Sequence, residues 1–187
     1  MSNLKHILRL SITLLLITAF IAAALAGVNA ITEDRIAAIQ ADKTQKAIGQ
    51  VLTFEGEAVL LENTPEKVNG VTITAVYETS AGYAVQVEPA GFGGGINMMV
   101  GVDFEGKVTG ISIISHAETA GLGAVAAADT GAGEAFRSQF VGQSGQLSVT
   151  KDGGTIDAIS SSTITSRAVT EGVNAAIACA SQLKGGQ

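Results

Sequence analysis

The residue types best suited to chemistry in this chain lie in the run Asp157–Ser166, which reads DAISSSTITS. One hydroxyl in it, that of Thr163, follows very small side chains and precedes a helical pattern. Small neighbours let a second enzyme reach such a hydroxyl, and the N-terminus of the following helix offers free N–H groups to a phosphate. The run therefore indicates a threonine that can be modified and can hold an anionic group. The ordinary alternative is a Ser/Thr cluster that only caps the helix.

Other catalytic patterns are weak. His116 is the only histidine beyond the N-terminal region, and no nucleophile-elbow pattern accompanies it. One histidine with scattered carboxylates matches no familiar zinc spacing. The glycine-rich run 91–95 lacks the Lys-Ser/Thr ending of a P-loop and precedes a strand pattern, so we interpret its glycines as bends or points of close backbone approach. A redox function would therefore need a bound cofactor.

The N-terminal region contains an uncharged apolar run from Leu10 to Ala30. As a helix this run would be about 31 Å long, enough to cross the hydrocarbon core of a bilayer. We therefore expect a short N-terminus at 1–9 and a transmembrane helix at 10–30. A cleavable signal peptide is the alternative, because Lys5 and Arg9 are basic and small residues end the run. Signal peptides, however, usually carry apolar runs of only about 7–15 residues.

The rest of the chain must position the chemistry. We expect a helical linker and turn region at 31–69 and a domain at 70–187. Alternating apolar residues predict a set of neighbouring antiparallel strands and a late helix. The predicted strands are 71–77, 83–87, 96–104, 108–115 and 147–149, and the predicted helix is 166–183. The fold class is thus α+β: one N-terminal transmembrane helix, then a soluble domain with an antiparallel sheet and flanking helices.

Charge and cysteine content exclude some classes of function. Beyond Ala30 there are nine Lys and Arg against seventeen Asp and Glu, a net charge of −8, and no basic stripe that would suit nucleic acid. The single cysteine, Cys179, excludes an intrachain disulfide and is expected to be a small buried apolar residue.

The run around Thr163 resembles the flavinylation motif of the FMN-binding domain family, which reads roughly D-x-x-S/T-G-A-T-x-S/T-S. Ser161 and Ser162 stand where that motif has Gly and Ala. If the Gly position requires positive φ, a serine there costs about 1 kcal/mol. The run His116–Gly123, HAETAGLG, is similar to the family's H-x-E-T-P-G-L-G, with Ala120 in place of Pro.

This resemblance implies a set of site residues. Thr163 would carry covalent FMN through a phosphoester bond made by a separate flavin transferase. Thr119, Leu122 and Gly123 would contact the isoalloxazine. The remaining implied cofactor-binding residues are Ser162, Thr165, Glu118 and His116; for the last two, the alternative is that they only hold the loop.

The whole chain resembles the G subunit of Rnf-type electron transport complexes, which is related to the C subunit of the sodium-pumping NADH:quinone oxidoreductase. The resemblance implies an electron-carrier subunit of a membrane complex that couples ferredoxin/NAD electron transfer to ion translocation, with no turnover by the isolated chain. It also implies other membrane subunits as partners, a domain on the outer face and a cytoplasmic N-terminus. Two alternatives remain: a flavinylated outer domain of another membrane reductase, and an anchored binding or assembly module without cofactor.

Overall fold

The computed structural model describes residues 2–62 and 64–185. Met1 of the predicted segment 1–9, Asn63 of the predicted linker and residues 186–187 of the predicted domain lie outside the described residues. The chain divides into two compact units, one ending at Asp42 and the other beginning at Lys43. Helix α1 (Ser2–Val51) contributes to both units. Its part His6–Glu33 is long and apolar enough to cross a membrane, and it contains the predicted span 10–30.

The second unit is built on an antiparallel sheet with the strand order β1-β3-β4-β5-β6. Its four long strands are β3 (Val71–Thr79), β4 (Gly82–Glu88), β5 (Asn97–Asp103) and β6 (Val108–Ser115). Two short strands, β1 (Val59–Leu60) and β2 (Lys67–Val68), both pair with β3. The predicted antiparallel sheet is therefore confirmed, and its four long strands overlap the predicted runs.

The turns between these strands follow from their residues. Asn69 and Gly70 join β2 to β3 with φ angles of 52° and 84°, as the two central residues of a type I′ turn require. Gly106, at φ 85°, turns the chain between β5 and β6, which correspond to the predicted neighbouring strands 96–104 and 108–115.

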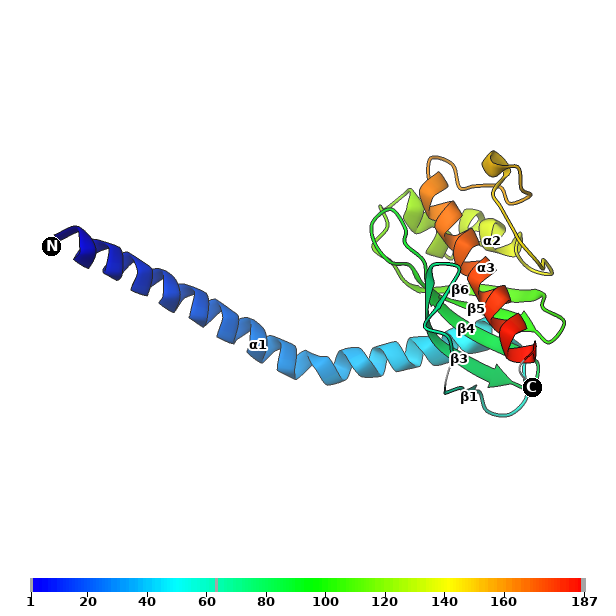
Figure 1. The fold of residues 1–187 in the computed structure, drawn as a ribbon, viewed down its shortest axis with the longest axis horizontal. Coiled ribbons are helices and arrows are strands. Elements are labelled where there is room, and N and C mark those ends of the chain that lie inside the picture. The colour runs from blue at the N-terminus through cyan, green and yellow to red at the C-terminus, as the bar shows by residue number, and fades with distance from the viewer. Residues whose placement is uncertain (1, 63, 186–187) are drawn as a thin grey trace. The chain divides into compact units, whose positions relative to one another are not determined.

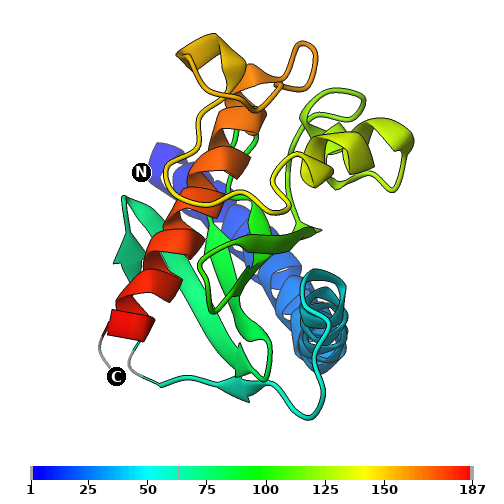
Figure 2. The same ribbon diagram turned by 90° about the vertical axis from the view of Figure 1, so that its right-hand side faces the viewer.

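Both faces of the sheet are covered, because apolar residues alternate between them along each strand. On one face, Tyr83, Val85 and Val87 of β4 join the core under helix α3 (Thr163–Gly185). On the other face, Ala84 and Met99 pack in a second core with the last residues of α1. Figure 2 shows the sheet between α3 and the last turns of α1.

Two glycines let the end of α1 lie directly on the sheet. Gly101 and Gly110 are cross-strand partners in β5 and β6. A Cβ atom on Gly101 would stand 2.4 Å from the carbonyl oxygen of Val51, and one on Gly110 would stand 3.0 Å from the Cα atom of Val51. The Thr109 hydroxyl donates a hydrogen bond to the same Val51 oxygen. Residues 43–51, which the sequence places in a linker, are thus part of the domain's core.

The connection from β6 to α3 contains three short helical segments, η1 (Gly123–Ala127), α2 (Gly131–Ser138) and η2 (Thr150–Asp152). Figure 1 shows η2 in gold near the beginning of α3, in orange. This connection brings residues from well-separated parts of the chain to the N-terminal end of α3.

The predicted strand at 147–149 is wrong. The Asn174 side chain of α3 bonds both backbone groups of Leu147, at 2.8 and 2.9 Å, where a strand would need a neighbouring strand. Val149 forms only an isolated parallel bridge with Ile156. Cys179 is fully buried in the core, as expected, and burial raises the pKa of its thiol to about 11.

Candidate functional site

A cavity of about 300 Å³ lies at the N-terminal end of α3, and we call it the Thr163 cavity. Three segments of the chain line it: the glycine-rich loop after β4, the loop after β6 and the loop that enters α3. Its lining residues are Phe92, Glu118, Thr119, Leu122, Gly123, Ser161, Ser162, Thr163, Ile164 and Thr165. Seven of the eight site residues expected from the sequence are among them, and His116 is not.

The loop that enters α3 is held at both ends by side chains. Gln139 accepts a hydrogen bond from the Asp157 backbone N–H at 2.7 Å and donates one to its carbonyl at 3.1 Å. The Ser166 hydroxyl accepts from the Ile159 N–H at 2.9 Å and donates to the Ser162 carbonyl at 3.0 Å. These contacts fix the backbone on either side of residues 160–162, so the loop presents Thr163 in a defined position.

Ser161 adopts a left-handed conformation, with φ at 60°. This is the position where the resembling motif has glycine, and the requirement for positive φ is met here by a residue that has a Cβ atom. Its side chain is exposed and lines the Thr163 cavity. The conformation carries a steric cost of about 1–2 kcal/mol, which the surrounding contacts must offset.

Ser162 does not act as an ordinary helix cap. Its carbonyl accepts the first helical bond, from the Ser166 N–H at 3.0 Å, which makes it the residue at the N-cap position. Its hydroxyl, however, is buried and has no hydrogen-bond partner among the described residues. The first-turn N–H groups of α3 therefore receive no capping bond from this side chain. A buried, unpartnered hydroxyl beside a cavity is the feature expected where a polar ligand completes the site.

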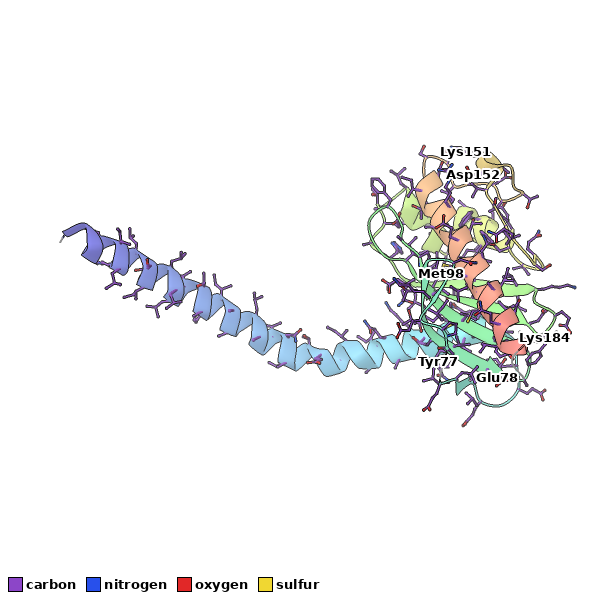
Figure 3. All side chains as sticks on the ribbon, in the orientation of Figure 1. Tyr77, Glu78, Met98, Lys151, Asp152 and Lys184 are labelled. Carbon is purple, nitrogen blue, oxygen red and sulfur yellow. The ribbon has the colours of Figure 1, made fainter. Side chains whose placement is uncertain are left out.

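Thr163 is the first residue of α3, and its hydroxyl contacts a cation. The Lys151 ammonium, in η2, donates a hydrogen bond to Thr163 Oγ1 at 2.8 Å. Its chain neighbour Asp152 forms a bidentate ion pair with Arg167, one turn into α3, with both N···O distances at 2.6 Å. The Arg167 hydrogen bond lowers the pKa of the Asp152 carboxyl. Figure 3 labels Lys151 and Asp152 at the end of the domain where α3 begins.

Glu118 joins two walls of the cavity. It is buried, and one carboxylate oxygen accepts a hydrogen bond from the Gly93 N–H at 2.9 Å. The other accepts a very short hydrogen bond from the Thr165 hydroxyl. A Cβ atom on Gly123 would stand 2.4 Å from Glu118 Oε2 and 2.5 Å from Thr165 Oγ1, so a larger residue there would have to displace this hydrogen-bonded pair. His116 does not line the cavity, and its Nδ1 accepts a hydrogen bond from the Glu118 backbone N–H at 3.2 Å.

The mouth of the cavity is apolar. Phe92, Leu122 and Ile164 expose 68%, 42% and 52% of their surfaces, although large apolar side chains are usually buried. They come from three different segments and all line the one cavity. Apolar side chains at the mouth suit a flat aromatic group. The exposed Lys151 ammonium, which contacts the Thr163 hydroxyl but does not line the cavity, suits an anion bound at that hydroxyl. The residues present therefore fit FMN, which combines an aromatic ring with a phosphate.

The sequence alone missed part of this site. Phe92 and Ile164 were not expected to line it, and neither the Lys151 contact nor the Asp152 ion pair was foreseen. A sequence pattern that could have indicated the Lys151 contact is the run Lys151–Gly154, a basic residue followed by Asp-Gly-Gly, shortly before the threonine expected to carry a phosphate.

Comparison with known proteins places this chain in a family. The FMN-binding domain model matches residues 91–178, and the RnfG N-terminal region model matches residues 1–51. The G subunit of the ion-translocating oxidoreductase complex of Methanosarcina acetivorans is 30% identical over 186 residues, which cover 95% of this chain and 96% of that protein. The chain belongs to the family of G subunits of Rnf-type complexes.

Two further similarities complete the comparison. The G subunit of the Na(+)-translocating ferredoxin:NAD(+) oxidoreductase complex of Acetobacterium woodii is 34% identical, over 92% of this chain and 91% of its own length. The C subunit of the Na(+)-translocating NADH-quinone reductase from Parabacteroides distasonis is a more distant structural neighbour. It is 21% identical, with a TM-score of 0.46, over 73% of this chain and 80% of that one. This member of the G-subunit family thus has an FMN-binding domain and an N-terminal helix long enough to span a membrane.

Proposed function

We propose that this protein carries FMN covalently, through a phosphoester to Thr163, and relays electrons within an Rnf-type complex that couples ferredoxin/NAD electron transfer to ion translocation. The observation that carries the proposal is the Thr163 hydroxyl itself. Thr163 lines a cavity with an apolar mouth, its hydroxyl lies 2.8 Å from a lysine ammonium, and the preceding residue has an unpartnered buried hydroxyl.

The chain's own residues have distinct tasks in this proposal. Phe92, Leu122 and Ile164 cover the apolar ring and keep water from it. Glu118 holds the glycine-rich loop against α3 through its bonds to Gly93 and Thr165, so the cavity keeps its shape. FMN, when bound, supplies a centre that accepts electrons singly or in pairs. An ester bond to the chain prevents its loss from an exposed site.

The membrane helix and the partners complete the proposal. Residues 10–30 span the membrane, the N-terminus is cytoplasmic, and the flavin domain works on the outer face beside other membrane subunits. Anchoring by one helix raises the effective concentration of the domain at those partners. A flavin transferase attaches the FMN during maturation. One relative, the G subunit of Acetobacterium woodii, supports the ferredoxin:NAD(+) reaction by its name. The isolated chain is expected to catalyse no turnover.

In-gel fluorescence tests the attachment. The full chain is produced with a flavin transferase, denatured, separated by electrophoresis and viewed under ultraviolet light. A fluorescent band is expected for the wild type and none for Thr163→Ala, whereas Thr150→Ala, a change at an exposed threonine outside the cavity, should leave the band intact. A band that persists in Thr163→Ala would place the flavin elsewhere. Co-purification of other membrane subunits with the native chain separates an Rnf-type complex from another membrane reductase.

A further inference from the structure

Lys151 is an exposed lysine whose side chain is directed at one particular hydroxyl. Its ammonium lies 2.8 Å from Thr163 Oγ1, although the two residues are twelve positions apart in the chain. A lysine at the surface gains little from a neutral hydroxyl, because water is an equally good partner for the ammonium. The position of the Lys151 side chain is therefore better explained by the negatively charged phosphoester that the Thr163 hydroxyl forms in the proposed function.

The charges nearby leave Lys151 available. Arg167, a second cation near the N-terminal end of α3, donates two hydrogen bonds of 2.6 Å to the Asp152 carboxylate, so these two charges offset each other. Glu171, one turn further along α3, also acts electrostatically on Arg167. Lys151 thus provides a positive charge beside Thr163 that no described carboxylate contacts within ion-pair distance.

The backbone around Lys151 is built for this position. Gly153 ends η2 with φ at 82°, and a Cβ atom on Gly154 would stand 1.9 Å from the Ser148 carbonyl oxygen. Because of this close approach to the Ser148 backbone, only glycine fits at position 154 of the turn that follows η2. The Asp152–Arg167 pair then fastens η2 to the first turns of α3, with Lys151 next to Thr163.

An independent observation indicates a polar ligand at the same point. The Ser162 hydroxyl, only 6% exposed as a residue and adjacent to Thr163, has no hydrogen-bond partner among the described residues and belongs to the wall of the Thr163 cavity. The N-terminal end of α3 is thus not simply a helix terminus. A cation contacts the hydroxyl of its first residue, and the residue before it has a buried hydroxyl without a partner.

We propose that Lys151 is the cationic partner of Thr163 in flavin attachment, stabilising the negative charge that develops on Oγ1 and on the phosphoryl group as the bond forms. This inference rests on the proposed function. In the step, Thr163 Oγ1 bonds to the FMN phosphorus of FAD, and the bond from that phosphorus to the bridging oxygen breaks. AMP leaves with the bridging oxygen, and the hydroxyl proton passes to a base of the transferase. No electrons are gained or lost.

The physical basis is a charge-assisted hydrogen bond that strengthens during the reaction. A hydrogen bond from an ammonium to an anionic oxygen is about twice as strong as one to a neutral hydroxyl, so Lys151 favours the charged transition state over the free threonine. Once the ester has formed, the phosphodiester retains one negative charge, and the same ammonium offsets it. Lys151 therefore both promotes attachment and stabilises the product.

The test measures the rate at which the full chain, in detergent, gains FMN from FAD with purified transferase, by intact mass. Lys151→Met removes the charge and keeps most of the stem, and Lys151→Arg keeps the charge. Lys107→Met, at an exposed lysine in the β5–β6 turn, is the matched control. We expect Lys151→Met to slow attachment about tenfold, less than for a buried donor because the site is partly screened by solvent. Lys151→Arg should recover most of the rate and Lys107→Met all of it.

A second readout separates charge from structure. The melting temperature of each chain is measured before and after attachment, at low and at high salt. Attachment should raise the melting temperature less in Lys151→Met than in the wild type, and high salt should remove that difference. Equal attachment rates and equal, salt-independent melting shifts in wild type and Lys151→Met would overturn the role of Lys151 and leave the proposed function intact. A wild type that gains no mass while a known substrate of the same transferase does would overturn both.

Discussion

The left-handed serine at the entrance to α3 provides a sharp test of the loop's geometry. Ser161 has φ at 60°, where a residue with a Cβ atom pays about 1–2 kcal/mol and glycine pays almost nothing. Glycine in turn loses about 0.5–1 kcal/mol more conformational entropy on folding. The serine side chain is exposed, and the described structure shows no hydrogen bond from it. Ser161→Gly should therefore leave the free energy of unfolding unchanged or increase it, by up to about 1.5 kcal/mol.

The neighbouring Ser160 supplies the matched control. It is exposed and lies in the same loop, but its φ is not positive. Ser160→Gly should therefore lower the free energy of unfolding by about 0.5–1 kcal/mol, the entropic cost alone. Both variants of the full chain are unfolded thermally in mild detergent and followed by circular dichroism. A domain of this size shifts by about 2–4 °C per kcal/mol. Equal destabilisation by both substitutions would refute the left-handed conformation at 161.

Three further predictions concern the core and the cavity wall. Gly101→Ala should lower the free energy of unfolding, measured by denaturant titration, by about 1–3 kcal/mol, because the new methyl group collides with the end of α1. The control Gly131→Ala places a methyl group in open space at the start of α2 and should be neutral or stabilising. Glu118→Ala should cost about 1–3 kcal/mol by leaving two donors unpaired, and Glu118→Gln, which retains one acceptor, should cost less by thermal unfolding. Cys179, with its thiol pKa raised to about 11, should resist iodoacetamide at pH 8 until the chain is unfolded. Rapid labelling of Cys179 in the folded chain would contradict its burial. Because folding raises the thiol pKa, the free energy of unfolding should fall as the pH rises towards about 11, which is measurable as a lower melting temperature.

The strands of the sheet could be predicted because their signal is local. Each long strand alternates its side chains between two apolar cores. Turn residues mark strand ends: Asn69-Gly70 precedes β3, and Gly106 lies between β5 and β6. The apolar stripe of the last helix is equally local. The left-handed conformation of Ser161 could also be anticipated, because the resembling motif has glycine at this position and glycine commonly marks a positive φ.

The features that the sequence did not reveal depend on partners far away in the chain. Leu147 looks like a strand residue, but a side chain from α3 satisfies its backbone. The end of α1 joins the core because two glycines on distant strands make room for it. Lys151 meets Thr163 only after a tight return through two glycines. No periodicity within a short window encodes such contacts.

The central claim is one covalent bond between Thr163 and FMN, and intact mass measurement of the native full-length chain tests it most directly. Protein purified from a host with a competent transferase should weigh more than the bare polypeptide by one FMN less one water. Peptide mapping should place that addition on Thr163, and Thr163→Ala should have the unmodified mass. A native chain of unmodified mass from the same host would contradict the account.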